Sequence, residues 1–505
     1  MSATGPTGAR RRLDGRALVL GLVLIGLGAV IATLAGPRPA ALGPVDTGDR
    51  ALAERVRAAL DGERGHLGVS VALVEDGRVR TAGVGDSGGA DHRPVDASTR
   101  FEIGSVAKPL TGMLLAQLAA QARVDPQAPL RTFLPRIRFE DPAVGSATLA
   151  ELASHRSGLP RLPVGPLTLT GPAASIRGDD PYADYGPDAV IAAVAGSEAE
   201  GRGEVAYSNL GMAVLGQALA ARAGTSYADL LDREILSPLG MDATTVVAGD
   251  AQPPSPSAQG RAANGSATAP WRGSGYTPAG SGVRSTADDM ARLVAGAMES
   301  SAPGAAATEP RFARDEDDRI GFGWFIRRRD RREITWHNGR TGGFSSFVGF
   351  DRAAGRGVVV LANTNRPVDA AGFRLLGVAE EDDGPGPLPL LLTVVGALGG
   401  GLIPLEFVLR RRGSRWRSSP DRLRLVTSVL SGVAVLVLVH RLGGWDAVPP
   451  VIWSVGATLL LAAAGLGAMR WRRLPLVAGG TRWARWAGAC ASAAGSLAIL
   501  VLVLG

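Results

Sequence analysis

The chain has 505 residues, a formal net charge of +7 and a single cysteine, Cys490. The positive charge is confined to the ends: residues 1–16 carry +3 and residues 385–505 carry +10, which leaves −6 between them. Because the middle of the chain is acidic, its composition does not support nucleic-acid binding. One cysteine excludes an intrachain disulfide and a cysteine-rich metal site, and the five histidines show no paired ligand spacing, so we expect neither a metal nor a cofactor.

The first predicted element is an apolar run from Ala17 to Ala35, which follows the basic residues Arg10-Arg11-Arg12 and Arg16. Nineteen residues are enough to span a bilayer as a helix. A cleaved signal peptide is the alternative, but the run is long for one, and Thr33-Leu34-Ala35 is a poor cleavage site. We therefore predict that residues 1–36 form a cytoplasmic tip and an uncleaved anchor.

Strand patterns occur near both ends of residues 45–378, which we interpret as one soluble domain. Residues 68–74 and 78–82 flank Asp76-Gly77, a strong hairpin signal. Residues 344–350 and 357–361 predict a closing strand pair.

Between these strands, helical patterning covers residues 106–122, 188–196 and 209–223. Two other segments, 161–187 and 250–280, are rich in Pro, Gly and Ser, and we expect them to be surface loops that frame a cleft. Strands at both ends with helices between them predict an α+β fold, in which the terminal strands share one antiparallel sheet flanked by helices.

After a predicted linker at 379–387, the region 388–505 contains four further apolar runs. These lie at about 388–409, 425–440, 450–469 and 486–504. Buried core helices are the alternative to membrane spans. Four successive runs argue against that alternative, as do six of the nine tryptophans, which fall at or near the ends of the runs as in an interfacial belt.

Arginine asymmetry predicts the orientation of these spans. The loop 410–424 holds seven arginines and the loop 470–485 holds five, whereas 441–449 holds only Arg441. Cytoplasmic loops carry the excess of basic residues, so we place the first two loops and the N-terminal cluster inside. The protein is then a multi-pass membrane protein whose soluble domain faces the extracytoplasmic side.

Lys108 is the only lysine, against 53 arginines, and it follows Ser105 by three residues. Arginine cannot lose its proton at ordinary pH, whereas a buried lysine can become a neutral base. An N-cap serine beside a surface lysine is the alternative, but a cation in the first turn of a helix opposes the macrodipole. Pro109 also places Ser105 near the start of a helix. The pair therefore indicates a serine hydrolase with a lysine base.

Two distant motifs accompany this pair. Tyr207-Ser208-Asn209 opens a predicted helix, and His337-Asn338-Gly339-Arg340 leads into a predicted strand. In this order and spacing, the three motifs make residues 52–376 resemble the serine β-lactamase and penicillin-binding-protein superfamily, in particular its class C-like branch. Ser105-x-x-Lys108 matches the first family motif, Tyr207-x-Asn209 matches the second, and His337-x-Gly339 occupies the place of Lys-Thr-Gly.

The resemblance implies a β-lactamase/transpeptidase-like fold with a helical subdomain, and a role for each motif residue. Ser105 would attack a carbonyl and become acylated, with Lys108 helping to take its proton. Tyr207 would relay protons, and Asn209 would hold the substrate amide. The N–H groups of Ser105 and Arg340 would form the oxyanion hole. Which of Lys108 and Tyr207 is the main base stays open.

His337 departs from the family pattern, in which a lysine helps to bind the carboxylate of penicillin-type ligands. Histidine is mostly neutral near pH 7, so we expect weaker carboxylate binding unless Arg340 compensates. This departure favours a peptidase or esterase over an efficient β-lactamase.

Three functions of different classes remain. The favoured one is a membrane-anchored serine hydrolase that cleaves an amide or ester of a small molecule or peptide, including cell-wall peptides. The second is a penicillin-binding-type ligand sensor that signals through the C-terminal helices, although the predicted cytoplasmic loops are short. The third, a catalytically silent scaffold, is disfavoured by the intact motif residues.

Overall fold

The computed structural model describes residues 26–60, 62, 64–163, 166–329, 331–380, 384, 386–410, 421–479 and 481–504. The chain divides into two compact units: Pro39–Gly384, and the residues up to Arg38 together with Pro385–Gly505. Each unit has its own hydrophobic core.

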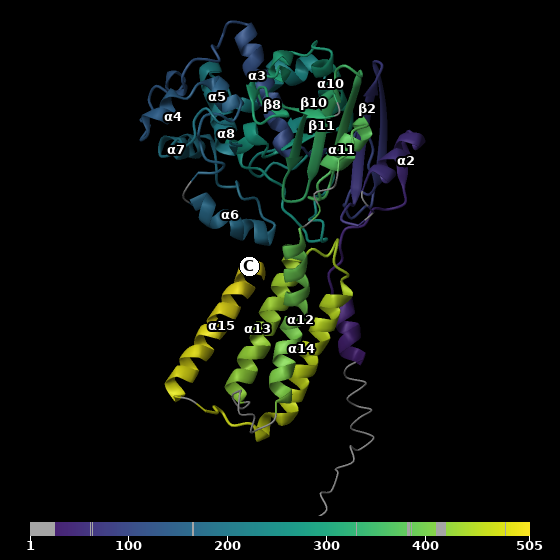
Figure 1. Ribbon diagram of the computed structural model, residues 1–505, viewed down its shortest axis with the longest axis vertical. Coiled ribbons are helices and arrows are strands. Elements are labelled where there is room, and N and C mark those ends of the chain that lie inside the picture. The colour runs from purple at the N-terminus through teal and green to yellow at the C-terminus, as the bar shows by residue number, and fades with distance from the viewer. Residues whose placement is uncertain are drawn as a thin grey trace, which may run out of the picture. The chain divides into compact units, whose positions relative to one another are not determined.

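The larger unit is built on a nine-stranded antiparallel sheet with the order β1-β3-β2-β12-β11-β10-β9-β8-β7 (Figure 1). The strands are β1 (Asp46–Gly48), β2 (Gly68–Glu75), β3 (Arg78–Gly85), β7 (Phe312–Ala313), β8 (Asp318–Ile320), β9 (Phe325–Arg329), β10 (Arg332–Arg340), β11 (Ser345–Asp351) and β12 (Arg356–Ala362). In the register of β2 against β12, Val71 lies opposite Val360. This pairing joins the two ends of the unit and confirms the predicted shared sheet.

Helices cover both faces of this sheet. Helices α2 (Arg50–Ala59) and α11 (Asp369–Leu376) pack on one face, and α10 (Ala287–Met298) packs on the other. Strand β2 shows why both faces need cover: Val71 and Leu73 enter the core under α2 and α11, while Ala72 and Val74 enter the core under α10. Alternate side chains of a strand point to opposite faces, so an almost wholly apolar strand is stable only when both faces are buried.

A helical part of the unit carries two of the three motifs. It contains α3 (Ala107–Ala120), α4 (Pro142–Ser146), α5 (Leu149–Ala153), α7 (Pro187–Ala195), α8 (Asn209–Ala223) and α9 (Tyr227–Leu231). Helices α3, α7 and α8 confirm the three predicted helical segments. A small second sheet, in the order β4-β6-β5, leads into α3; its strands are β4 (Phe101–Glu102), β5 (Thr245–Val246) and β6 (Val283–Ser285). The predicted α+β fold is confirmed.

One predicted loop is partly wrong. Residues 161–187 contain helix α6 (Pro166–Arg177). The proline and glycine content predicted a loop, but Pro166 stands at the first helical position, where a missing N–H costs no intrahelical hydrogen bond. Pro172 lies inside the helix. Residues 250–280 contain only a short helical stretch, Ser274–Ala279, and are otherwise turns and irregular chain.

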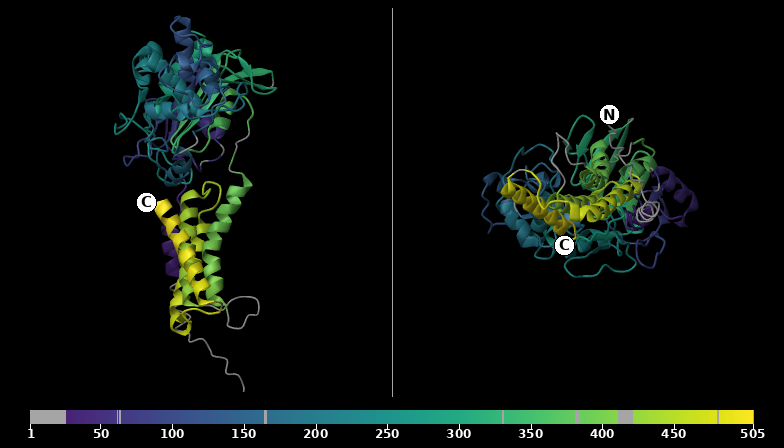
Figure 2. Two further views of the ribbon diagram at one scale, coloured as in Figure 1. Left: turned by 90° about the vertical axis from the view of Figure 1, so that its left-hand side faces the viewer. Right: turned by 90° about the horizontal axis from the view of Figure 1, so that it is seen from below.

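Among the described residues of the smaller unit, four helices are long and apolar enough to cross a membrane: α12 (Pro387–Leu409), α13 (Arg422–Leu442), α14 (Val451–Arg470) and α15 (Arg482–Leu504). They correspond to the four predicted runs and run alongside one another in the side views (Figure 2). The predicted anchor falls partly outside the described residues, but its described part is helical over residues 26–34.

Glycines bring α12 and α14 into close contact. A Cβ on Gly401 would lie 2.1 Å from the carbonyl oxygen of Gly456, and a Cβ on Gly456 would lie 1.9 Å from the carbonyl oxygen of Ala397. Small residues of this kind allow the backbones of membrane helices to approach each other. Helix α13 begins at an N-cap, Asp421, which is completely buried and pairs with Arg485 of α15.

Candidate active site

The segment that carries Ser105 is held against the end of β10. Gly104 has a φ of +48°, and a Cβ there would lie 2.8 Å from the backbone nitrogen of Arg340, so the close approach depends on glycine. On the other side of the same turn, Ser346 Oγ donates a hydrogen bond of 2.7 Å to the carbonyl oxygen of Ile103. Ser105 lies in the short helical turn Gly104–Val106 that continues into α3, near the helix start that its spacing from Pro109 predicted.

Lys108 is completely buried and points its ammonium nitrogen at Ser105. Lys108 Nζ lies 2.8 Å from Ser105 Oγ and 2.7 Å from the carbonyl oxygen of Ala279. Burial, and secondarily the charge of Arg161, lowers the pKa of Lys108 well below its usual value of 10.5. Lys108 Nζ donates both of these hydrogen bonds. A neutral amine still has the two N–H groups that they require, and its lone pair makes it a base.

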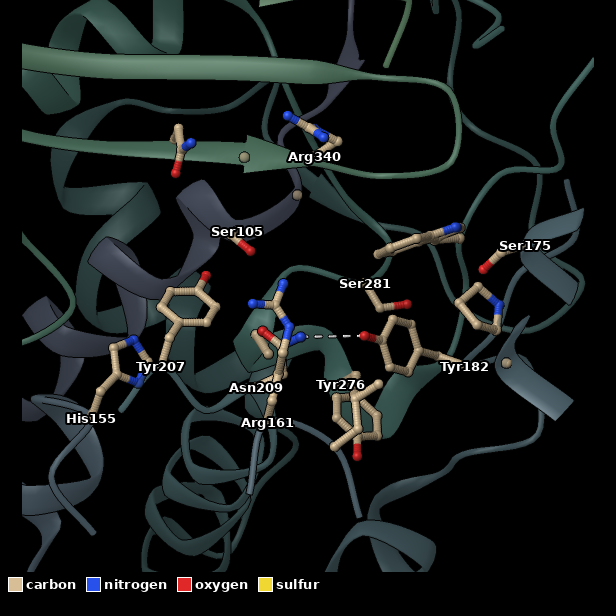
Figure 3. A pocket seen from close by; sticks show the side chains of 18 of the residues that line it. Ser105, His155, Arg161, Ser175, Tyr182, Tyr207, Asn209, Tyr276, Ser281 and Arg340 are labelled. Carbon is tan, nitrogen blue, oxygen red and sulfur yellow. Dashed lines mark hydrogen bonds between the residues drawn. The ribbon is translucent and has the colours of Figure 1, made fainter. Parts of the chain in front are cut away.

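The second motif lies at the start of α8. Ser208 is the N-cap, and its hydroxyl accepts a hydrogen bond from the backbone N–H of Gly211. The Tyr207 hydroxyl points toward Ser105 (Figure 3), and Asn209 Nδ2 donates a weak hydrogen bond of 3.4 Å to the Tyr182 hydroxyl. Burial raises the pKa of Tyr207 above its usual value, and a hydrogen bond with Ser105 only partly offsets the rise. Tyr207 is therefore a neutral phenol at ordinary pH.

The third motif occupies the last residues of β10. His337 is completely buried, and its Nδ1 donates a hydrogen bond of 2.6 Å to the carbonyl oxygen of Asn338. Burial and the charge of Lys108 lower its pKa to about 3, so its side chain carries no charge at neutral pH. Gly339 packs against the nucleophile segment: a Cβ there would lie 2.0 Å from the carbonyl oxygen of Ile103.

A cleft of about 860 Å³ opens over this arrangement. Five of the predicted site residues line it: Ser105, Tyr207, Asn209, Gly339 and Arg340. All of them except Gly339 are labelled in Figure 3. Lys108 and His337 do not line the cleft and lie behind its wall, because their side chains are completely buried. The three motifs thus meet at one place, although they are spread over more than 200 residues of chain.

Residues 161–187 and 250–280, which were expected to frame a cleft, supply other walls, but sequence reasoning named none of the side chains that line them. An aromatic cluster forms one of them: the Tyr182 ring lies 4.4 Å from the Tyr276 ring and 5.1 Å from the Trp271 ring. These aromatics come from the two segments that were predicted to frame a cleft, and aromatic residues within loops rich in Pro and Gly were the available signal.

His155, which belongs to none of the three motifs, also lines the cleft. Its ring lies 4.5 Å from the Tyr207 ring, and its Nδ1 accepts a hydrogen bond of 3.3 Å from the backbone N–H of Ser208. Burial, together with the charge of Lys108, lowers its pKa well below the usual value. The neutral ring supports Tyr207 from behind.

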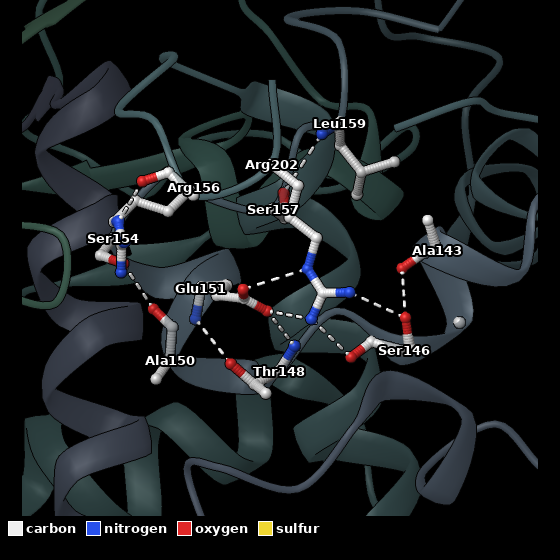
Figure 4. Close-up of polar contacts among 12 residues, drawn as sticks. Ala143, Ser146, Thr148, Ala150, Glu151, Ser154, Arg156, Ser157, Leu159 and Arg202 are labelled. Carbon is white, nitrogen blue, oxygen red and sulfur yellow. Dashed lines mark hydrogen bonds and ion pairs between the residues drawn. The ribbon is translucent and has the colours of Figure 1, made fainter. Parts of the chain in front are cut away.

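A polar network fixes the chain between α5 and the cleft. Arg202 makes two hydrogen bonds to the carboxylate of Glu151, at 2.7 and 3.0 Å, and a third of 2.8 Å to Ser146 Oγ (Figure 4). Glu151 also completes a capping box with Thr148 at the start of α5. This network fixes α5, the helix that precedes the segment from His155 to Arg161. The position of that segment at the cleft is therefore fixed as well.

Among the described residues, no group of three or more His, Cys, Asp or Glu side chains is placed to hold a metal ion.

Comparisons with known proteins agree with this geometry. A family model described as Beta-lactamase matches residues 50–381. A "Beta-lactamase-like protein" of Arthroderma benhamiae is 25% identical over 277 residues, which cover 49% of this chain and 44% of the relative. "Penicillin-binding protein 4" of Amycolatopsis lactamdurans is 31% identical over 178 residues, which cover 34% of this chain and 43% of the relative. The matches thus span less than half of the length of either curated relative.

Two solved structures share the fold. A class C β-lactamase from Rhodobacter sphaeroides superimposes with a TM-score of 0.55 at 23% identity, covering 65% of this chain and 99% of that one. The D-alanine carboxypeptidase AmpC from Burkholderia cenocepacia gives a TM-score of 0.54 at 24% identity, with the same coverage of 65% and 99%.

Proposed function

Because the chain belongs to the beta-lactamase family, whose members are serine hydrolases, we propose that it cleaves an amide or ester through an acyl-enzyme on Ser105. The contact of 2.8 Å between Lys108 Nζ and Ser105 Oγ carries this proposal. The lysine is fully buried and its pKa is lowered, whereas an arginine in its place could not become a neutral base.

In the acylation step, Ser105 Oγ attacks the substrate carbonyl carbon and its proton passes to Lys108 Nζ. Tyr207 is the weaker candidate for this base, because burial raises its pKa and leaves its hydroxyl protonated. As the C–N or C–O bond breaks, the Tyr207 hydroxyl gives its proton to the leaving atom. The ammonium of Lys108, 4.9 Å from the centre of the Tyr207 ring, stabilises the phenolate until the proton is returned.

In deacylation, a water molecule attacks the same carbonyl carbon. Tyr207 and Lys108 together accept its proton, and the bond to Ser105 Oγ breaks with return of a proton to that oxygen. The backbone N–H groups of Ser105 and Arg340 are the proposed donors to the carbonyl oxygen, and Asn209 is the proposed partner of the substrate amide. The close approach of Gly104 to Arg340 supports the assignment of the two N–H donors.

A small molecule or peptide is the proposed substrate, including peptides of the cell wall. His337 is uncharged and buried, so it supplies no cation to a penicillin-type carboxylate. We therefore favour peptidase or esterase activity over efficient β-lactamase activity. The relatives named for penicillin binding and for D-alanine carboxypeptidase activity are compatible with such substrates.

Activity-based labelling of the full-length protein in detergent tests the nucleophile. We expect a fluorophosphonate probe to label the wild type and to leave Ser105→Ala unlabelled; labelling of that variant at the wild-type rate would refute the assignment. Lys108→Arg keeps the charge but cannot act as a neutral base, so labelling should fall by at least about a hundredfold. A panel of D-Ala peptides, p-nitrophenyl esters and a cephalosporin then ranks the substrates.

We further propose that α12 to α15 anchor the protein as a multi-pass membrane protein, with residues 39–384 outside the cytoplasm. The arginine asymmetry between the connecting loops supports this orientation. In a Cys490→Ser background, an impermeant maleimide added to intact cells should label Ala447→Cys and spare Ser418→Cys. The opposite labelling pattern would reverse the orientation.

A further inference from the structure

The lining of the cleft is basic. Three arginines line it, Arg161, Arg314 and Arg340, and no aspartate or glutamate is found among the described lining residues. The Arg314 guanidinium lies 3.8 Å from the carboxylate of Asp318. Within the described part of the chain, the guanidinium groups of Arg161 and Arg340 have no hydrogen-bond or ion-pair partner. Unpaired guanidinium groups in a cleft favour an anionic ligand, because a carboxylate fits their donors in pairs.

Arg161 has a fixed place beside the proton donor. Its guanidinium carbon lies 5.3 Å from the centre of the Tyr207 ring. Its backbone carbonyl accepts hydrogen bonds of 3.1 and 3.3 Å from the N–H groups of Asn209 and Leu210, at the start of α8. The side chain itself is exposed in the cleft, near Tyr207 and Asn209 (Figure 3). The backbone of Arg161 is therefore fixed, while its guanidinium group is accessible to a ligand in the cleft.

Arg161 and Arg340 come from different walls. Arg340 ends β10, whereas Arg161 belongs to the segment that meets α8, and Ser105 lies between them in the close-up view (Figure 3). In the proposed reaction, Tyr207 protonates the leaving atom. A group attached to the leaving part of the substrate is thus brought toward Arg161. His337 is buried behind the wall and offers no charge to that group.

We propose that Arg161 binds an anionic group on the leaving part of the substrate and selects for leaving groups that carry a carboxylate. This inference rests on the proposed acyl-enzyme function. In this inference, the anion is bound on the Tyr207 side of the cleft by an arginine that follows α5. This arginine replaces the lysine that the family carries in its third motif.

Two matched esters test the proposal with the full-length protein in detergent. The 3-carboxyphenyl and 3-carbamoylphenyl esters of N-acetylglycine share one acyl group, and their leaving groups differ mainly in charge. The change in the ratio of their kcat/KM values between variants reports recognition of the anion, because the intrinsic difference in leaving ability between the two esters is the same for every variant. We expect the wild type to prefer the carboxylate by about tenfold to a hundredfold, as for a charge-assisted pair.

Arg161→Gln should bring this ratio close to one, and Arg161→Lys should retain part of it. Arg314→Gln is the matched control, since it removes the same charge from the same cleft and should keep the ratio. Fluorophosphonate labelling and the melting temperature verify that each variant is folded. The backbone hydrogen bonds of residue 161 do not depend on its side chain.

Two results would overturn the inference: a wild-type ratio near one, or a preference that survives Arg161→Gln. Loss of the preference in Arg340→Gln but not in Arg161→Gln belongs to the second case and transfers the role to Arg340. If both esters are cleaved at equal rates and Ser105→Ala cleaves neither, the proposed function stands and only this inference fails. If hydrolysis does not depend on Ser105, the proposed function fails, and the inference fails with it.

Discussion

Glu102 and Arg284 form an ion pair that is almost completely withdrawn from solvent behind the nucleophile segment. The Arg284 guanidinium lies 2.9 Å from the Glu102 carboxylate, and the two side chains are 4% and 1% exposed. The same carboxylate oxygen accepts a hydrogen bond of 3.2 Å from the backbone N–H of Trp271. The pair joins β4 to β6 three residues before Ser105, and it also fixes Trp271 in the wall of the cleft.

Glu102→Gln should strongly destabilise the larger unit. The substitution leaves Arg284 buried without a charged partner, which costs roughly 3–5 kcal/mol in free energy of unfolding. Calorimetry of the full-length protein should show a melting temperature lowered by about 4–7 °C. Glu54→Gln is the control, because its pair with Arg50 has side chains 66% and 91% exposed and should contribute little. Equal melting temperatures for the two variants would contradict this account of the buried pair.

The parts of the fold that follow from short-range patterns could be predicted from the sequence. Asp76-Gly77 predicted the β2–β3 hairpin, and both residues have positive φ, +51° and +71°, as a tight hairpin turn of this type requires. The three motifs could be predicted for a similar reason. Each motif is a short residue pattern, and the order of the three motifs along the chain can be read without any knowledge of distant contacts.

The elements that depend on distant contacts could not be predicted. Strand β9 ends in three arginines, Arg327 to Arg329, and shows no apolar alternation; it is a strand because it pairs with β10. The recruitment of Arg161 and Trp271 to the cleft has the same origin. The composition of residues 161–187 and 250–280 predicted that they frame a cleft, but not which of their side chains face it, because the walls form only when segments from across the unit are brought together.

Gly339→Ala should disable the site. The added methyl group would lie 2.0 Å from the carbonyl oxygen of Ile103, a backbone atom that cannot rotate away. The end of β10 must therefore move from the nucleophile segment, and a displacement of about 1 Å at a reacting centre costs on the order of a hundredfold in rate. The rate of fluorophosphonate labelling measures this loss. Gly186→Ala meets nothing within 4 Å and should keep the wild-type rate; equal rates for the two variants would show that the contact with Ile103 is unimportant.

Lys108→Met should change how stability depends on pH. The pKa of Lys108 is lowered in the folded chain, so between that value and 10.5 the unfolded chain binds one more proton. The free energy of unfolding of the wild type therefore rises with pH in this window, by about 1.4 kcal/mol per pH unit from this group. The variant lacks this contribution, so urea unfolding at pH 7, 8 and 9 should show the wild type gaining stability relative to Lys108→Met. A difference that does not change with pH would mean that Lys108 is protonated in the folded protein.

His337→Lys should increase reaction with penicillin. The pKa of His337 is lowered to about 3, so the side chain stays uncharged from pH 5 to 9 and contributes no cation. A lysine at this position restores the amine that the family motif places there, at some cost in stability, because the position is completely buried. We expect the rate of labelling by fluorescent penicillin to rise by about tenfold, which corresponds to about 1.4 kcal/mol of added attraction.

His337→Gln, which adds no charge, should give no increase, and Ser105→Ala combined with His337→Lys should abolish labelling. An equal increase in the glutamine variant would show that the shape of the site, and not the missing cation, limits the reaction with penicillin.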